Sequence, residues 1–387
     1  MIACAALIPR SALFDSFPIR SSFPHEEPKV EKSTVAAGRD PSTPSAAILT
    51  TPISDASAWR AADFRGDDSW AVTLTETAVA EIDAALQLAR RRGQTVQTIT
   101  CDSFPLPSVG RLLADVRHQL EYGRGFLVLR GLPIDRYTDD EAALLYRGIG
   151  AHIGAAVSQN AKGDLLGHVF DRGYAEYRGR SDIRGYQTRA ELEFHTDVVD
   201  IVGLLCLRTA QEGGQSVIVS STTIHNEMLA RAPTLLGLLY GNFLFDRRGE
   251  EVDGQPPFFV SPIYSWYKGY LSCRPAIIEY IYSAQQKTGI VLSAAQDQAL
   301  QTFLNHAARE DLQFRMDFQP GDIQLLNNSV VLHSRTAYRD HAEEHRKRHL
   351  LRLWLNVGDG RPVDPAAFPY RGGVPIGQAR SPAHNAR

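Results

Sequence analysis

Apolar residues at helical spacing mark five segments of the chain. In the first segment, Val79, Ile82 and Ala85 fall on one side of a helical repeat, and Gly93 ends the run. The fourth segment contains Pro233, which lacks a backbone N–H and should break the helix. The pattern predicts helices over 75–92, 109–122, 139–154, 224–240 and 292–309.

Short apolar or alternating runs, bounded by glycine, proline and polar residues, predict strands in most of the remaining chain. A hairpin is predicted where 258–266 and 269–273 flank Tyr267 and Lys268. The other predicted strands cover 125–132, 164–170, 201–207, 215–220, 312–318, 322–326, 330–333 and 349–357. Helices and strands do not alternate, so the expected fold class is mainly β with flanking helices, as a barrel or a jelly roll of two sheets.

Composition narrows the class of partner. The 387 residues are 43% hydrophobic and 22% charged, with a net charge of -3, which gives no indication of nucleic-acid binding. A small ligand, or an anion held by a few arginines, fits this balance better. The four cysteines form no C-x-x-C pair, which argues against a disulfide framework or a thiolate zinc site. No apolar run reaches the ~18 residues of a membrane-spanning helix, so we expect no membrane partner.

Missing motifs direct attention to metal chemistry. The sequence has no phosphate-binding loop, no G-x-G-x-x-G after a strand and no G-x-S-x-G elbow. One large class of ferrous oxygenases binds iron through two histidines and one carboxylate. Residues i and i+2 of a strand point the same way, so His195 and Asp197 could reach one ion.

The H-x-D spacing alone is weak, because the chain has 12 histidines and three H-x-E pairs as well. These pairs begin at His25 in the N-terminal tail, at His225 near a helix start and at His341 in a charged run. His195 differs because Phe194 precedes it and a predicted strand follows within a few residues. His195 and Asp197 are therefore the preferred ligand pair.

A third ligand and a cationic site are predicted downstream. His333 ends the apolar run VVLH, although a histidine there could equally be a core residue. Arg348 and Arg352 lie on one face of a predicted apolar strand, where a charge is seldom buried unpaired. They could receive the carboxylates of a diacid, or form structural ion pairs with Glu191 or Glu193.

Five elements in this order resemble the taurine dioxygenase-like (TauD/TfdA) family of iron(II)/2-oxoglutarate oxygenases. The family pattern is H-x-D, a G-G-x-[ST] turn, a distal histidine and two arginines spaced four apart. The resemblance covers roughly 123–358, and its elements are His195-Thr196-Asp197, Gly213-Gly214-Gln215-Ser216, His333, Arg348 and Arg352.

The resemblance implies a double-stranded β-helix and specific residue roles. His195, Asp197 and His333 would bind Fe(II). Arg348, helped by the Ser216 hydroxyl, would hold the distal carboxylate of the co-substrate 2-oxoglutarate. Arg352 would face the substrate or the other end of the co-substrate. The implied reaction consumes O₂, releases succinate and CO₂, and hydroxylates or desaturates a small organic substrate that is amino-acid-like or a secondary metabolite.

The substrate contacts are less constrained. Gln159, Asn160 and Gln187 lie in two segments expected to line the pocket, and Arg352 is a further candidate. The N-terminal region before the core is longer than in the taurine enzymes, which argues against a sulfonate substrate.

Two other functions compete with this hypothesis. His341, Glu344 and His345 match the H-x-x-E-H motif of inverted zinc peptidases. Their highly charged neighbours instead favour a solvated loop between two strands. The second alternative is a non-catalytic small-molecule-binding jelly roll, which the intact ligand triad and both arginines disfavour.

The expected domain plan follows from these assignments. Residues 1–50 form a disordered tail or targeting segment, and 51–122 a helical extension. Residues 123–360 form the oxygenase domain, and 361–387 a flexible tail. We expect a cytoplasmic protein, with mitochondria as the alternative because the first residues resemble a transit peptide. Homo-oligomers are compatible with the sequence.

Overall fold

The computed structural model describes residues 47–175, 177, 183–251, 254–275, 277–368 and 371–376. The prediction of a tail or targeting segment over 1–50 falls almost wholly outside these residues. None of the described helices combines the length and the apolar character that crossing a bilayer requires.

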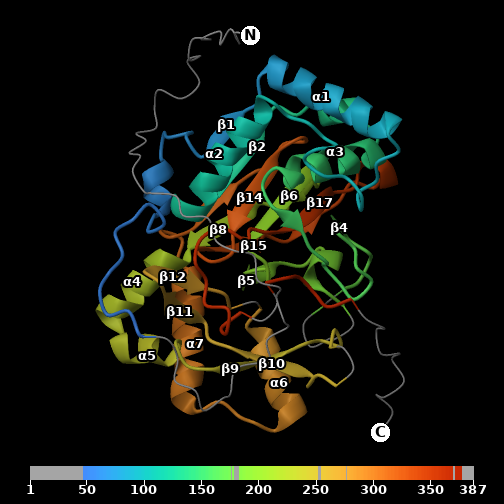
Figure 1. The fold of residues 1–387 in the computed structure, drawn as a ribbon. Helices are drawn as coiled ribbons and strands as arrows, with labels where there is room; N and C mark the ends of the chain where they lie inside the picture. Colours follow the sequence, from blue (N-terminus) through green and yellow to red (C-terminus); the bar gives the residue numbers. More distant parts are fainter. Residues whose placement is uncertain are drawn as a thin grey trace, which may run out of the picture. The chain divides into compact units, whose positions relative to one another are not determined.

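Two sheets form the centre of the fold (Figure 1). The larger sheet has seven strands in the order β1-β2-β14-β6-β17-β3, and β4 also pairs with β17. The smaller sheet has the order β13-β8-β15-β5. The larger sheet consists of β1 (Ala71–Thr73), β2 (Phe126–Arg130), β3 (Ala155–Ala156), β4 (Leu166–Val169), β6 (Ile201–Arg208), β14 (Ile323–Asn327) and β17 (His349–Asn356). The smaller sheet consists of β5 (Leu192–His195), β8 (Ser216–Ser220), β13 (Phe314–Met316) and β15 (Val331–Arg335).

Inward-facing side chains of both sheets share one apolar cluster, so the sheets face each other. This cluster includes Phe126 and Leu326 from the larger sheet and Ile218 and Val331 from the smaller one. The expected jelly-roll core is therefore present.

Helices cover the outer faces of the two sheets (Figure 1). The first three helices share an apolar cluster with the larger sheet, and the next helices share a cluster with the smaller one. The first group is α1 (Glu76–Arg91), α2 (Val109–Tyr122) and α3 (Asp139–Ala151). The second group is α4 (Ser221–Arg231), α5 (Pro233–Leu238), α6 (Glu279–Thr288) and α7 (Ala294–Ala307).

The second helical group belongs to a long insertion between β8 and β13. Three two-stranded sheets complete the described strands. They pair β9 (Phe243–Asp246) with β10 (Phe258–Ser261), β11 (Tyr264–Tyr267) with β12 (Tyr270–Cys273), and β7 (Glu212–Gly213) with β16 (Tyr338–Arg339). Because the insertion separates two neighbouring strands of the jelly roll, it can vary without disturbing their pairing.

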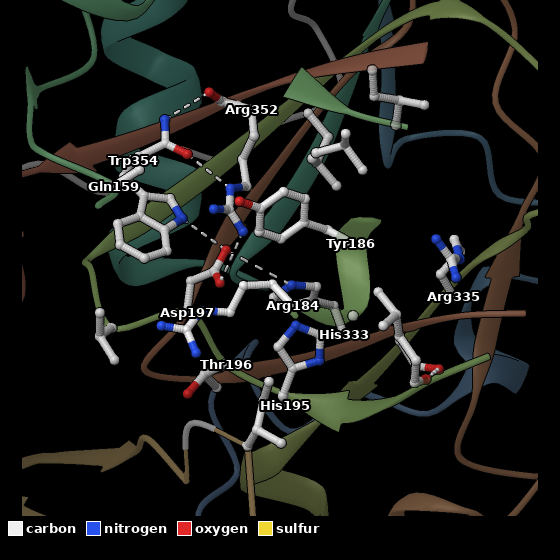
Figure 2. A pocket seen from close by; sticks show the side chains of 18 of the residues that line it. Gln159, Arg184, Tyr186, His195, Thr196, Asp197, His333, Arg335, Arg352 and Trp354 are labelled. Carbon is white, nitrogen blue, oxygen red and sulfur yellow. Dashed lines mark hydrogen bonds and ion pairs between the residues drawn. The ribbon is translucent and has the colours of Figure 1, made fainter. Parts of the chain in front are cut away.

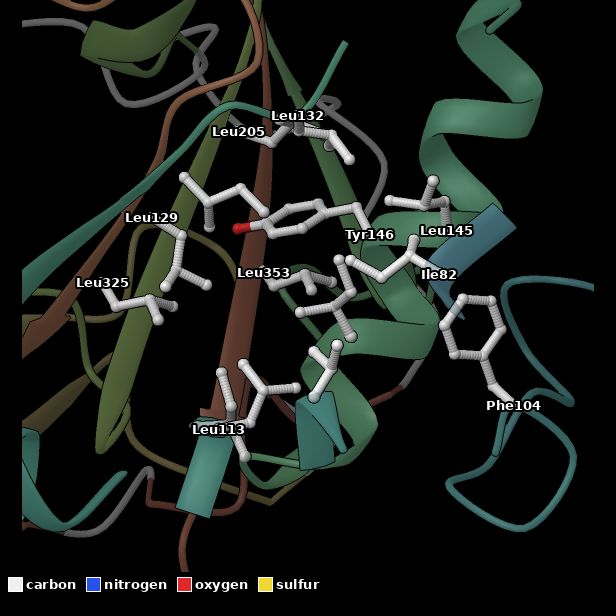
Figure 3. Close-up of a cluster of buried hydrophobic side chains, with 14 of the residues drawn as sticks. Ile82, Phe104, Leu113, Leu129, Leu132, Leu145, Tyr146, Leu205, Leu325 and Leu353 are labelled. Atoms are coloured by element: carbon white, nitrogen blue, oxygen red, sulfur yellow. The ribbon is translucent and has the colours of Figure 1, made fainter. Parts of the chain in front are cut away.

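The interface between α3 and the larger sheet is close-packed. Tyr146 of α3 lies among Leu129, Leu205 and Leu353 of three different strands (Figure 3). A Cβ atom at Gly150 would come within 2.7 Å of Leu353, so the glycine allows the helix to approach the sheet. The cluster holds the larger sheet from its outer side.

Most predicted elements are confirmed, and the errors are local. The 224–240 helix is indeed broken, since α4 ends at Arg231 and α5 begins at Pro233. The predicted strand 258–266 is wrong as one element, because β10 pairs with β9 whereas β11 pairs with β12. Pro262 separates β10 from β11 and cannot donate to a ladder. Helix α6 was not predicted, and neither were β9, β5 and the short strands β1, β3, β7 and β16.

The proposed domain boundaries remain predictions, but several structural facts bear on them. β1 pairs in parallel with β2, so part of the 51–122 segment belongs to the larger sheet. At the other end, Arg361, Val363 and Ala367 are buried, although we expected a flexible tail from residue 361. The Arg361 guanidinium donates to the carbonyl oxygens of Glu121 and Leu271.

Candidate active site

Three predicted ligands converge at one end of the space between the sheets. One ligand atom from each of His195, Asp197 and His333 lies within 4.8 Å of the others, and all three residues are buried. Their side chains point toward one another across a pocket (Figure 2). In the described part of the chain, no other group of metal-ligating residues meets this criterion.

Strand pairing places the two histidines together. His195 on β5 is the direct register partner of His333 on β15, and their ring centroids are 4.2 Å apart. Facing residues of neighbouring antiparallel strands project from the same side of a sheet. Asp197 follows β5, and its backbone N–H donates to Asn328 Oδ1 at 2.9 Å. Asn328, in the turn before β15, is thus a positioning residue that the sequence analysis did not single out.

Hydrogen bonds leave the ligand atoms suited to a metal ion. His195 Nδ1 lies 2.7 Å from the Glu193 carbonyl oxygen, so Nδ1–H donates and Nε2 keeps its lone pair. His333 Nε2 lies 4.0 Å from Asp197 Oδ2. Trp354 Nε1 donates to the same Asp197 oxygen at 2.9 Å and fixes the carboxylate.

The electrostatic environment favours the protonation states that metal binding requires. Burial lowers the pKa of His195, and burial together with the His195 and Arg352 charges lowers the pKa of His333 to about 3. Burial tends to raise the pKa of Asp197, but Arg352, both histidines and the Trp354 hydrogen bond outweigh it and lower this pKa overall. Two neutral imidazoles and one carboxylate result, which is the donor set of ferrous oxygenases.

Arg348 also lines this pocket and presents an unused donor. Its side chain is buried, and Nη1 has no hydrogen-bond partner among the described residues. The guanidinium carbon lies 5.1 Å from the ring centroid of Tyr338. Leaving a buried charged donor unpaired is costly, so the site fits a carboxylate that arrives with a ligand.

The glycine turn brings Ser216 and Arg348 together. Gly213 and Gly214 have φ values of 74° and 73°, and a Cβ at Gly213 would lie 2.2 Å from the Ala337 carbonyl oxygen. The turn leads directly into β8, whose first residue, Ser216, lines the pocket. In this structure the Ser216 hydroxyl donates to Gln324 Oε1 at 2.9 Å.

Arg352 enters the pocket from the same face of β17. Its Nη1 lies 3.6 Å from Asp197 Oδ1, and its Nε donates to Gln159 Oε1 at 2.9 Å. Its guanidinium carbon lies 4.8 Å from the Tyr186 ring centroid and 4.7 Å from that of Trp354. The structure thus places Arg352 beside the ligand triad, and not in the alternative ion pair with Glu191 or Glu193.

The three predicted substrate contacts have different positions. Gln159 lines the pocket, but its amide donates to the Arg352 and Leu165 carbonyl oxygens, so it positions Arg352. Asn160 lines the pocket and bonds within its own loop to Asp164. Gln187 is not among the lining residues, and its side chain accepts from the Arg184 backbone N–H, so its role as a substrate contact stays a prediction.

Some lining residues were not singled out by the sequence analysis. Arg184 and Tyr186 lie in the segment 184–197 that was expected to line the pocket, whereas Glu250 and Tyr280 come from the long insertion and were missed. No motif marks the last two, because their positions depend on how the insertion packs. Arg335, one residue from Ser334 on β15, also lines the pocket.

The zinc-hydrolase alternative is contradicted. Glu344 and His345 are exposed on a short turn between β16 and β17, and Glu344 pairs with Lys347 at 2.5 Å. With His341 they do not form a metal-ligating group among the described residues. The expectation of a solvated loop between two strands is confirmed there.

Comparison with known proteins identifies the family. The sequence model described as "Taurine catabolism dioxygenase TauD, TfdA family" matches residues 89–354. The chain belongs to the TauD/TfdA family. It is accordingly an oxidoreductase of the iron(II)- and 2-oxoglutarate-dependent dioxygenase type, as the resemblance implied.

Two curated relatives cover most of the chain. The FR-33289 synthase of Streptomyces rubellomurinus is 37% identical over 339 residues, which are 87% of this chain and 99% of that protein. The taurine hydroxylase-like protein SAT17 of Stachybotrys chartarum is 32% identical and covers 79% of this chain and 80% of its own length.

Solved structures show the same fold at low identity. Asparagine oxygenase, in complex with Fe(II), 3-hydroxyasparagine and succinate, has a TM-score of 0.58 at 18% identity, covering 74% of this chain and 93% of that one. The non-heme iron oxygenase OrfP, in complex with Fe and alpha-ketoglutaric acid, has a TM-score of 0.54 at 12% identity, with the same coverage. The predicted double-stranded β-helix is thereby confirmed.

Proposed function

We propose that this protein hydroxylates an unactivated C–H bond of a small amino-acid-like or secondary-metabolite substrate, with Fe(II) bound by His195, Asp197 and His333. The observation that carries the proposal is that this triad lines one pocket with Arg348, whose buried Nη1 has no partner among the described residues. Two neutral histidines and one ionised carboxylate beside a buried arginine fit Fe(II) together with a dicarboxylate.

The iron and 2-oxoglutarate supply the oxidising chemistry once both are bound and O₂ has reacted. The chain's own residues position the reactants. Trp354 and Arg352 hold the Asp197 carboxylate in its ionised form, while the Glu193 carbonyl fixes the tautomer of His195. We assign Arg348 to the distal carboxylate of 2-oxoglutarate, and Ser216 to the same group after its hydroxyl turns from Gln324.

The relatives support a small metabolite as the substrate. The bacterial relative is named as the synthase of one compound, FR-33289. The solved neighbours carry hydroxylated asparagine and arginine. Hydroxylation is therefore favoured over desaturation, although both begin with removal of hydrogen from carbon.

Anaerobic reconstitution tests this function. Wild-type protein with Fe(II) and 2-oxoglutarate should develop a weak visible charge-transfer band, and it should release succinate when O₂ is admitted. His333→Ala should show neither signal, because two ligands hold iron much more weakly than three. His306→Ala is the matched control, since this histidine lies on α7 and bonds to the Thr302 carbonyl. If the band and succinate survive in His333→Ala, the assignment is wrong.

A further inference from the structure

The pocket contains a second arginine with one open donor atom, which the iron and 2-oxoglutarate sites do not use. Arg184 lines the pocket and directs Nη2 to Glu250 Oε1 at 2.5 Å. Its Nη1 is buried and has no hydrogen-bond partner among the described residues. Arg274, which pairs with Asp200 outside this pocket, also leaves Nη1 without a partner, so what distinguishes Arg184 is that its open donor belongs to a pocket-lining side chain.

Arg184 is held in place from both sides. Its backbone N–H donates to Gln187 Oε1 at 2.9 Å, at the start of a short 3-10 turn. Arg335 Nη1 donates to the Thr188 carbonyl at 3.0 Å, which fastens the end of the same turn to β15. The guanidinium is thus presented to the pocket by a pre-organised segment, which reduces the entropic cost of ligand binding.

The Arg184–Glu250 pair lines the same pocket as the three predicted iron ligands. Tyr280, on α6, lines the same pocket. Burial raises the pKa of its hydroxyl, and the charges of Arg184, Glu250 and Asp197 also act on it. Figure 2 shows Arg184 entering the pocket into which Asp197 and Arg352 also point. Arg348 is already assigned to the co-substrate. Arg352 is engaged by Asp197 and Gln159, and Arg335 donates to backbone carbonyls. Arg184 is therefore the lining arginine whose open donor is left for the substrate.

The charge of the loaded pocket indicates what kind of substrate it attracts. The described lining residues include four arginines and two carboxylates, an excess of two positive charges. Fe(II) and the 2-oxoglutarate dianion cancel each other, so this excess remains after both have bound. A buried excess of positive charge favours an anionic substrate over a neutral one.

We propose that Arg184 is the specificity-determining residue, which binds an oxyanion group of a small acidic substrate in competition with Glu250. Arg184 Nη1 is the docking point, and Glu250 is the internal anion that occupies the guanidinium until substrate arrives. The shared chemistry is an oxyanion, from either a carboxylate or a tetrahedral phosphonate, since a guanidinium pairs with both. This inference rests on the proposed oxygenase function.

Simple probes can test it in the Fe(II)- and 2-oxoglutarate-loaded protein without O₂. Butanoate, propylphosphonate and the neutral butanamide are titrated at constant ionic strength, with the change in the visible band as the signal. Wild type should bind at least one anion about tenfold more tightly than butanamide. Comparing butanoate with propylphosphonate then distinguishes the two oxyanions.

Variants assign that preference to Arg184. Arg184→Met should reduce it to about twofold, while 2-oxoglutarate affinity stays unchanged. Glu250→Gln should change the anion affinity in the opposite direction. It should bind the anion about threefold more tightly than wild type, because the carboxylate that competes for Arg184 is gone. Arg189→Met is the matched control, since Arg189 is exposed on the same segment and is not among the lining residues.

The outcomes separate this inference from the function it rests on. Failure of wild type to form the band would refute the oxygenase function itself. A normal band with an anion preference that survives Arg184→Met, or no preference in wild type, overturns only the role of Arg184. Equal weakening by Arg184→Met and Glu250→Gln would also overturn it, since that pattern belongs to a structural pair. If Arg184→Met does not load, Arg184→Lys carries the test and should bind the anion at least about threefold more weakly than wild type.

Discussion

The two faces of the larger sheet differ, and strand β17 shows the difference within a single run of residues. Leu351, Leu353 and Leu355 point to the helices and belong to the apolar cluster there. Arg352 and Trp354 alternate with them and line the pocket. The alternation follows from the two-residue period of a strand, so one strand serves both the packed layer and the active site.

The two faces of the sheet have different roles: the pocket face carries the groups that would bind ligands, and the helix face contributes packing that stabilises the fold. On the pocket side, Arg184 and Arg348 each bury an Nη1 atom without a partner among the described residues, and both side chains line a cavity that a ligand can fill. On the helix side the Tyr146 hydroxyl is also without a partner, but it lies among packed apolar side chains. Burying a charged donor without a hydrogen-bond partner raises the free energy of the ligand-free protein. On the helix side, close packing of apolar side chains offsets this cost. Substitutions on the two faces should therefore change different measurements.

The largest effect is expected on the pocket face. Arg348→Gln should weaken 2-oxoglutarate binding by about 100-fold, because a charge-assisted pair to a carboxylate is lost in a buried site. The free energy of unfolding should fall by less than about 1 kcal/mol, since no protein partner of Nη1 is lost. Titration of the visible band and urea unfolding measure the two quantities.

Arg339→Gln is the control for this substitution, because Arg339 is exposed on β16 and pairs with Glu212. If Arg348→Gln binds 2-oxoglutarate as tightly as wild type, the assignment of ligand binding to the pocket face is contradicted.

Leu353→Ala tests the helix face of the same strand. Leu353 is 1% exposed and packs against Tyr146 and Gly150, so the variant should lose about 3 kcal/mol of unfolding free energy. Affinity for 2-oxoglutarate in the folded protein should stay within about twofold. Val291→Ala, at a 77% exposed position, should be nearly neutral. A large loss of affinity in Leu353→Ala would show that the faces are coupled.

Gly148→Ala sharpens the comparison by opposing two effects in α3. Replacing a helical glycine usually stabilises by up to about 1 kcal/mol. Here a Cβ would lie 2.5 Å from the ring of Phe104, which is fully buried and cannot retreat. The steric cost should exceed the helix-propensity gain, so the free energy of unfolding, measured by thermal or urea unfolding, should fall by about 1–2 kcal/mol.

Gly237→Ala in α5 provides the matched case for Gly148→Ala, because its Cβ would meet only Ile48, at 3.9 Å. It should be neutral or stabilising, and equal losses in both variants would argue against a packing cause.

The smallest effect lies away from both faces and depends on pH. Arg60 and Arg309 donate to Glu227 on α4; although burial opposes them, these hydrogen bonds lower the pKa of Glu227 to about 2 from its usual 4.5. A lowered pKa in the folded state stabilises above pH 4.5, and this stabilisation is lost as pH falls toward 2. Glu227→Gln should therefore cost about 1 kcal/mol at pH 7, a modest value because the arginines are partly exposed.

Urea unfolding of wild type and Glu227→Gln at several pH values checks this prediction. The difference between them should be constant above pH 5 and shrink below it. A difference that grows on acidification would mean that the sign is wrong.

The helices and most strands could be predicted because they follow from local periodicity. Apolar spacing is enough to locate α1 and α2 closely, and Pro233 is enough to divide α4 from α5. Spacing and order were enough to select the three candidate ligands that the structure brings together, since H-x-D, a glycine turn and a distal histidine are sequence features. Helix α6 was missed although Ile278, Ile281 and Ala284 recur at near-helical spacing.

The sequence by itself determined the reaction class, because the ligand types and the order of the motif are carried by the residues themselves. Tertiary structure alone decided which loop residues line the pocket. It joined the Gln187 side chain to the Arg184 backbone, turned Gln159 toward Arg352, and brought Arg184 together with Glu250, which is 66 residues away in the chain. Such pairs depend on how an insertion folds back over the jelly roll, and no local pattern records that path.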